Sequence, residues 1–171
     1  MIDRCHLRLL PALLAVAAAC GTSTPAAPAP KIPDGAVDVA WTDTGASRVA
    51  HEYYSGFNEP ARLVIDNQAT WAWAWARLYQ TLLPVPATPT EDFDRFTVLV
   101  VGSGTHGTGG YDIRVTRVAS FGDRLYVEVT STAPGPHCFV TEAFTQPVDV
   151  VRIPKPNPTI VFVNRDVAPN C

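Results

Sequence analysis

Hydrophobic and polar residues alternate over several short stretches of the chain. The alternation is clearest over residues 111–118 and 124–130, which are separated by a short connection containing Gly122. A period of two predicts strands with one buried face, and the short connection predicts a hairpin. The apolar run 96–101 predicts a strand buried on both faces. Further strands are predicted at 37–41, 48–54, 61–65, 147–153 and 159–163.

One segment has helical spacing. Four apolar residues lie on one face of a helical projection: Trp71, Trp75, Leu78 and Leu82. Asn67 is a candidate N-cap, and Pro84 follows the end of the pattern. Tryptophan at every second position also fits a strand, but the alanine content favours a helix at about 67–82. Trp73 then lies on the other face, either as a contact for a partner or half-buried against a loop.

The longest apolar run lies near the N-terminus. Two arginines precede residues 9–19, a run too short to cross a bilayer as a helix but typical of the core of a secretory signal. The sequence Ala-Ala-Ala-Cys-Gly at 17–21 resembles the box of bacterial lipoproteins, in which cleavage precedes a cysteine that is then acylated. We therefore expect a signal peptide at 1–19 and a lipid on Cys20. Cleavage at the same position by the ordinary signal peptidase is the alternative.

The rest of the chain divides into a tether and a folded part. Residues 20–33 comprise the cysteine and a Pro/Ala-rich segment with a single charge, which predicts a flexible tether. Residues 34–171 are expected to form a single β-rich domain, a small antiparallel β-sandwich-like fold with one α-helix. The expected location is the bacterial cell envelope, where the exported protein is attached to a membrane through its lipid. The sequence leaves the membrane and its face open.

Two cysteines remain after the predicted processing. They are Cys138 and Cys171, 33 residues apart. In an oxidising compartment, two thiols within one small domain are expected to form a disulfide, with two free thiols as the alternative.

Charge and motif context argue against nucleic acid and nucleotide ligands. The 13 basic and 16 acidic residues give a net charge of -3, so the chain has no excess of positive charge for phosphates. Residues 102–107 fit the dinucleotide-binding pattern GxGxxG. However, the loop leads into a predicted strand, so no helix N-terminus is available to hold a pyrophosphate.

Catalytic and metal-binding arrangements are also poorly supported. Ser103, His106 and Asp112 could be combined into a hydrolase site, but the chain lacks a nucleophile-elbow motif around Ser103. Zinc-ligand spacing is absent from the remaining candidates, which are His51, His106, His137 and Cys138. We therefore expect no catalytic residue, no metal and no cofactor, and we expect the histidines in solvated loops.

Five short motifs follow one another between residues 96 and 162. They are Val100-Val101-Gly102, Thr108-Gly109-Gly110-Tyr111, Thr132-Ala133-Pro134-Gly135-Pro136-His137-Cys138, Thr145-Gln146-Pro147 and Ile153-Pro154-Lys155. In order and spacing, this region resembles the C-terminal domain of the protease-complex subunit PrcB family. The resemblance implies an exported, non-enzymatic lipoprotein domain that associates with a secreted protease complex and stabilises it. It implies no catalytic residue.

The first functional hypothesis is therefore binding of a protein partner, such as a secreted or surface protease. The candidate contacts are Thr108, Gly109, Gly110, Tyr111, Trp73 and His137. Two alternatives remain open. One is a protease inhibitor that presents a loop from a rigid β scaffold. The other is a carrier that binds a small ligand at the tryptophan cluster.

Lipidation can be tested directly. Cells that express the chain should incorporate labelled palmitate into it, and Cys20→Ser should abolish the label because the acyl acceptor is removed. Globomycin should shift the gel mobility of the unsubstituted protein by blocking the lipoprotein signal peptidase. Absence of the label from the unsubstituted protein would contradict the lipid anchor.

Overall fold

The computed structural model describes residues 28–42, 45–155 and 159–171. The predicted signal peptide at 1–19, Cys20 and the first part of the predicted tether lie outside the described residues.

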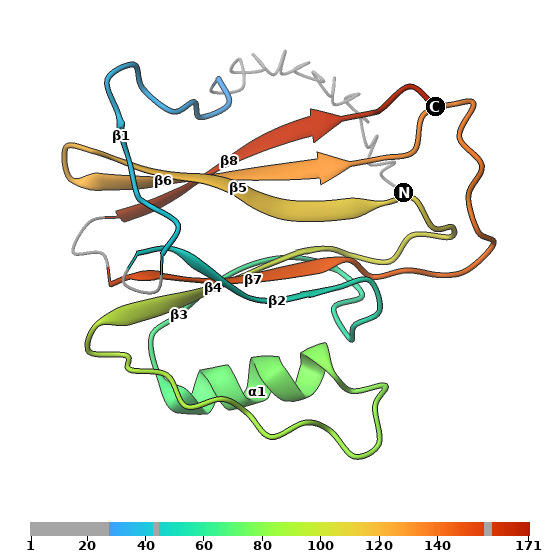
Figure 1. Cartoon of the computed structure of the whole chain (residues 1–171), viewed down its shortest axis with the longest axis horizontal. Helices are drawn as coiled ribbons and strands as arrows, with labels where there is room; N and C mark the ends of the chain where they lie inside the picture. The colour runs from blue at the N-terminus through green and yellow to red at the C-terminus, as the bar shows by residue number, and fades with distance from the viewer. Residues whose placement is uncertain (1–27, 43–44, 156–158) are drawn as a thin grey trace, which may run out of the picture.

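In the described part of the chain, two four-stranded sheets pack face to face, and a helix covers the outer face of one of them (Figure 1). The first sheet has the strand order β1 (Val37–Asp38), β5 (Asp112–Phe121), β6 (Arg124–Thr132) and β8 (Thr159–Val167). The second has the order β2 (Ser47–Glu52), β7 (Val148–Pro154), β4 (Phe96–Ser103) and β3 (Pro60–Ile65). Helix α1 (Gln68–Leu78) lies on this second sheet. The prediction of a mainly β, sandwich-like fold is confirmed.

Strand pairing departs from the antiparallel prediction at one place. Strands β6 and β8 run parallel, whereas the other paired strands are antiparallel. Strand β7 separates these two strands in sequence but belongs to the other sheet. The chain therefore reverses direction twice between β6 and β8, and β8 returns with the direction of β6.

Strand β4 is buried on both faces, as its apolar sequence predicts. Leu99 and Val101 belong to the core between the sheets, whereas Val98 and Val100 belong to the core beneath the helix. Strand β4 thus contributes to both cores, as β7 also does, and it pairs with β3 on one side and β7 on the other.

Helix α1 begins as the sequence predicts. The Asn67 side chain accepts a hydrogen bond from the Thr70 backbone N–H at 2.9 Å, which satisfies a donor that the first helical turn would leave unpaired. The predicted inner face is buried at Trp71, Trp75 and Leu78. The two indole N–H groups on this face donate to carbonyls of the connection that follows the helix.

The helix ends earlier than predicted. It stops at Leu78 rather than Leu82, and Tyr79 has a non-helical backbone with φ −107° and ψ 23°. The backbone N–H of Gly56 donates to the Arg77 carbonyl at 2.9 Å, so a residue from another segment supplies a hydrogen bond to a carbonyl in the last helical turn. The Tyr79 hydroxyl donates to Glu52 at 3.0 Å, and burial together with that carboxylate raises the pKa of Tyr79 to about 12. These contacts replace the last predicted turn.

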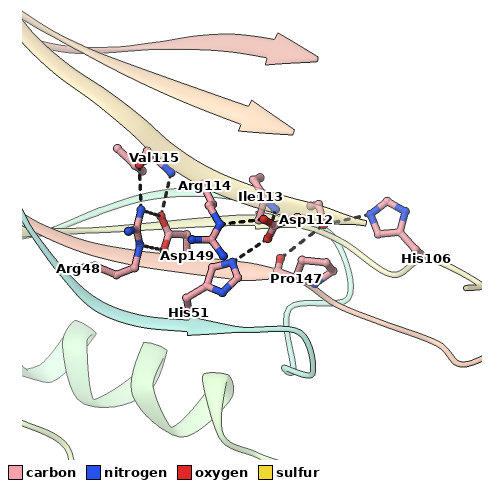
Figure 2. Close-up of polar contacts among 10 residues, drawn as sticks. Arg48, His51, His106, Asp112, Ile113, Arg114, Val115, Pro147 and Asp149 are labelled. Atoms are coloured by element: carbon pink, nitrogen blue, oxygen red, sulfur yellow. Dashed lines mark hydrogen bonds and ion pairs between the residues drawn. The ribbon is translucent and has the colours of Figure 1, made fainter. Parts of the chain in front are cut away.

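An ion pair within the second sheet, between partly exposed Arg48 and buried Asp149, also bonds to the first sheet (Figure 2). Asp149 on β7 is fully buried and accepts hydrogen bonds from Arg48 Nε at 2.6 Å and Arg48 Nη2 at 3.1 Å. It also accepts one from the Val115 backbone N–H of the opposite sheet at 2.8 Å, while Arg48 Nη2 donates to the Val115 carbonyl at 3.0 Å. We call this set of three residues the Arg48–Asp149–Val115 clamp.

The clamp supplies hydrogen bonds that the first sheet lacks. Strand β1 pairs with β5 only at Ala119 and Ser120, so no strand of the described residues pairs with β5 on that side near Val115. A buried backbone N–H or carbonyl without a partner costs about 1–3 kcal/mol. At Val115 the second sheet provides both partners, and this contact coincides with an irregularity in β5 between Val115 and Arg117.

We predict that Asp149→Ala lowers the free energy of unfolding by about 3–5 kcal/mol, because Arg48 and the Val115 N–H lose a buried partner. Urea denaturation followed by tryptophan fluorescence measures this loss. Asp123→Ala, at the exposed turn between β5 and β6, is the matched control and should change stability by less than about 0.5 kcal/mol. A loss below about 1 kcal/mol for Asp149→Ala would contradict the importance of the clamp.

Candidate functional site

Three connections and the chain's C-terminal residues meet at one end of the sandwich, which we call the loop end (Figure 1). The connections are 53–59 between β2 and β3, 104–111 between β4 and β5, and 133–147 between β6 and β7. We call 104–111 the bracing loop and 133–147 the presenting loop.

Backbone hydrogen bonds fix the presenting loop onto the bracing loop. His106 and Thr145 exchange two N–H to carbonyl bonds at 2.8 and 3.0 Å. The N–H of Gly109 donates to the Thr141 carbonyl at 2.9 Å, and the Thr145 hydroxyl donates to the Thr108 carbonyl at 3.0 Å. The two loops therefore form one hydrogen-bonded unit rather than two independent connections.

Close packing between the loops requires glycine at position 110. Gly110 has a φ of +86°, a conformation that residues with a side chain rarely adopt. A Cβ placed there would lie 2.9 Å from Val140 and 3.1 Å from Pro134, both in the presenting loop. The next residue, Tyr111, stacks on the imidazole of His106 with ring centroids 3.9 Å apart.

A disulfide forms the second attachment of the presenting loop. Cys138 and Cys171 are bonded, with Cα atoms 5.1 Å apart, so the predicted pairing is confirmed. The bond ties the loop to the residues that follow β8.

The presenting loop carries apolar side chains that do not pack into either core. Phe139 is fully exposed, Phe144 is 70% exposed and Val140 is 37% exposed. We call these three residues the presented patch. Tyr53, whose carbonyl accepts a hydrogen bond from the presenting loop at Gln146, is also exposed. Exposed large apolar side chains on a fixed backbone are typical of a surface that binds another protein.

The structure brings five of the six predicted contact residues to the loop end. Thr108, Gly109, Gly110 and Tyr111 lie in the bracing loop, and exposed His137 lies in the presenting loop. The contacts of Thr108, Gly109 and Gly110 hold the presenting loop in place, whereas Tyr111 stacks on His106 within the bracing loop. Trp73 lies elsewhere, on the solvent side of helix α1, where it is 53% exposed.

Phe139 and Phe144 were missed by the sequence reasoning. Both lie in a stretch without alternation, between a Pro/Gly-rich segment and β7, so no period marks them as buried or exposed. The signal that could have identified them is the closeness of aromatic residues to a cysteine in a region where the sequence predicts no strand. A constrained loop with large apolar side chains is a candidate binding surface.

The possible hydrolase residues do not form a triad. Ser103 Oγ lies 3.0 Å from His106 Nε2, but no carboxylate in the described chain is hydrogen-bonded to His106. Burial lowers the pKa of His106. Asp112 instead contacts His51 Nε2 at 2.7 Å and Arg114 Nε at 2.8 Å (Figure 2). A serine nucleophile also needs an oriented base and an oxyanion site, which this arrangement does not supply.

The expected solvated positions of the histidines hold only in part. His137 is exposed in a loop, as expected. His51 lies within β2, where its contact with Asp112 bridges the two sheets, and His106 is stacked on Tyr111. For His51 the expectation was wrong, because the residue lies in a strand. His106 lies in a loop, as expected, but its ring is partly buried against Tyr111.

A small cavity opens beside the bracing loop. Its volume is about 180 Å³, and its lining includes Ser103, His106, Tyr111 and Asp166. The described residues contain no group of three or more His, Cys, Asp or Glu side chains placed to hold a metal ion. No helix among them has the length and apolar character needed to cross a bilayer.

The central part of the chain matches one protein-family model. Residues 97–154 match the PrcB C-terminal family. The resemblance expected from the five motifs is thereby confirmed for this segment, which runs from β4 to β7 and includes both loops. No curated protein and no solved structure matched the chain. Strands β1 to β3, helix α1 and strand β8 lie outside the matched PrcB C-terminal segment.

We predict that Cys138→Ser lowers the free energy of unfolding by about 3–4 kcal/mol, because the bond closes a segment of 33 residues. Thermal unfolding of the oxidised protein and of the variant measures the difference. Dithiothreitol should destabilise the unsubstituted protein by a similar amount and leave the variant unchanged. Equal stability of all three samples would contradict a structural role for the bond.

Proposed function

We propose that this protein is a non-enzymatic, exported lipoprotein that binds a protein partner through the presented patch. The single observation that carries the proposal is the exposure of Phe139 and Phe144 on a loop that is fixed from two sides. A loose loop could fold such side chains against its own surface. Here the hydrogen bonds to the bracing loop and the disulfide hold the backbone, so the apolar side chains remain available.

The physical properties of the patch suit protein recognition. Aromatic residues dominate the binding energy of many interfaces because they bury a large area with few rotatable bonds. A loop that is ordered before binding loses less conformational entropy when the partner arrives. The presented patch combines both advantages.

The proposed partner is a secreted protease or protease complex. Support comes from the PrcB C-terminal match, since the family resemblance implies association with such a complex. The proposed site of action is the cell envelope, with attachment through a lipid on Cys20. The incomplete arrangement around Ser103 and His106 supports a binding role rather than hydrolysis.

The braced loop also favours one second candidate, direct inhibition of the protease. Protease inhibitors present a rigid loop to the active site, and the disulfide and bracing loop give this loop comparable constraint. The two functions differ in their effect on the enzyme. A stabilising subunit prolongs protease activity without lowering the initial rate, whereas an inhibitor lowers the initial rate in proportion to its concentration.

We predict that a tagged form, purified from detergent-solubilised envelope, enriches a protease over an unrelated lipoprotein. The double variant Phe139→Ser and Phe144→Ser should recover at least about tenfold less of this protease, because the apolar contacts are lost. Phe121→Ser is the matched control, since Phe121 is also exposed but lies at the opposite end of β5.

The control should recover the protease at the level of the unsubstituted protein. Equal recovery by the double variant would show that the presented patch is not the binding surface. Failure to enrich any protease would contradict the proposed partner class. Unchanged thermal unfolding of both variants is required, so that loss of binding is not loss of the fold.

A further inference from the structure

The core between the two sheets ends in small and polar side chains at the loop end. Every second residue of a strand lies on the same face, because successive side chains point to opposite faces. Val101 of β4 belongs to this core, and Ser103 is the next residue on its face. Val129 of β6 is followed in the same way by Ser131. Two strands from different sheets therefore place a serine, rather than a larger apolar residue, at the end of their inner faces.

Strand β8, at the edge of the first sheet, continues this pattern. Phe162 packs against the core, and Asn164 and Asp166 share its face of the strand. The Asn164 side chain accepts a hydrogen bond from Arg62 of the second sheet at 3.1 Å, as expected for a face that points between the sheets. At the loop end, the inner face of this strand therefore carries a carboxylate in place of an apolar side chain.

Ser103, Ser131 and Asp166 line the cavity beside the bracing loop, which we call the end cavity. Its volume is about 180 Å³. Protein cores pack closely and contain few voids larger than a water molecule. A cavity of about 150 Å³ is large enough to hold a benzene molecule. The end cavity therefore has room for a ligand with one ring of this size.

The accessible walls of the end cavity are mainly apolar. One wall is formed by the rings of His106 and Tyr111, which are stacked with their planes within 7° of parallel. Ala133 and Val167 contribute aliphatic groups, and a hydrogen bond of 3.0 Å from the Ala133 N–H to the Val167 carbonyl holds them together. Aromatic rings pack well against other flat rings, so these walls favour a planar, apolar ligand.

One carboxylate of the lining is available to a ligand. Among the described residues, the Asp166 side chain has no hydrogen bond and no ion pair. Asp112, the other carboxylate of the lining, already contacts His51 and Arg114 (Figure 2). A hydrogen bond to an ionised acceptor is stronger than one between neutral groups. A hydrogen-bond donor on the ligand would therefore be recognised by Asp166.

The surrounding charges favour a neutral donor. Burial lowers the pKa of Arg62, and the negative charge of Asp166 opposes this effect. Arg114 forms an ion pair with Asp112 at 2.8 Å. The charges of both carboxylates are thus opposed by nearby arginines, which weakens the attraction for a cation. Burial also lowers the pKa of His106, which favours the neutral form of its ring.

We propose that the end cavity binds one planar aromatic ring that carries a hydroxyl group. The ring packs between the stacked pair His106 and Tyr111 and the aliphatic groups of Ala133 and Val167. Its hydroxyl donates a hydrogen bond to Asp166. This chemistry has two sources, which are a free phenol and a tyrosine side chain of a protein partner.

Two other classes of ligand fit the end cavity less well. A sugar ring carries hydroxyl groups around its edge, and mainly apolar walls leave several of them without a partner. An aromatic carboxylate brings a third negative charge to a lining that already holds Asp112 and Asp166. No residue of the presented patch lines the end cavity, so the proposal does not depend on the function proposed for the loop end.

The test titrates the full-length, oxidised protein with three small probes and follows amide NMR chemical shifts. Phenol has both proposed features, toluene lacks the hydroxyl, and cyclohexanol lacks the planar ring. We expect saturable shifts with phenol at Ser131, Ala133 and Val167, and a dissociation constant of about 1 mM because the probe is small. Toluene should bind about fivefold more weakly and cyclohexanol at least about tenfold more weakly, because each loses one contact.

Substitutions then separate the contributions of the ring and the hydroxyl. Ala133→Leu should abolish phenol binding without lowering thermal stability, because the larger side chain fills the end cavity. Ala87→Leu, in the exposed connection after α1, is its matched control and should bind normally. Asp166→Ala should remove the preference for phenol over toluene, whereas Asp123→Ala should retain it. Asp166 is exposed, so this variant tests the proposal even if Ala133→Leu does not fold.

A blocked tyrosine amide distinguishes the two sources of the ring. Binding at least as tight as that of phenol identifies a tyrosine side chain, whereas binding of phenol alone identifies a free small molecule. The double variant Phe139→Ser and Phe144→Ser should bind phenol normally, which separates the end cavity from the presented patch.

The proposal would be overturned by any of four results. These are the absence of saturable shifts with phenol, shifts confined to residues away from the end cavity, equal affinity for phenol and cyclohexanol, and an unchanged phenol preference in Asp166→Ala.

Discussion

One buried carboxylate makes directional bonds to both sheets. Asp149 receives three hydrogen bonds, two from Arg48 of its own sheet and one from the Val115 N–H of the other. Apolar packing holds sheets together without fixing how they slide or rotate, whereas these directional bonds specify one arrangement. A second cross-sheet contact, between His51 and Asp112, lies nearer the loop end. The bracing loop leads directly into Asp112, so the geometry of the loop end follows from how the sheets are joined.

The proposed binding surface depends on how its loop is held. At the loop end, large apolar side chains are held away from the core by hydrogen bonds between loops and by a disulfide. A loop that is ordered in this way favours recognition of a shaped surface.

The sequence predicted those features that arise from repeated local patterns. Alternation located the hairpin of β5 and β6 because each strand has one buried face, and the spacing of Trp71, Trp75 and Leu78 located the buried face of the helix. The end of the helix was not predictable, since it depends on Gly56 and Glu52 from another segment. The Arg48–Asp149 pair was equally inaccessible, because its members are 101 residues apart and no local pattern links them. At the loop end, glycines and the cysteine pair were recognisable, whereas Phe139 and Phe144 follow no period.

The position of Cys171 in the chain places the disulfide late in the folding of this protein. Strands β7 and β8 lie between the two cysteines, so the bond cannot close until both strands have been synthesised. It also requires an oxidising environment, which a reducing cytosol does not provide. Before that point the presenting loop is held by the bracing loop alone. The exposed phenylalanines therefore reach their final rigidity only after β7, β8 and Cys171 have been synthesised, and only where thiols are oxidised.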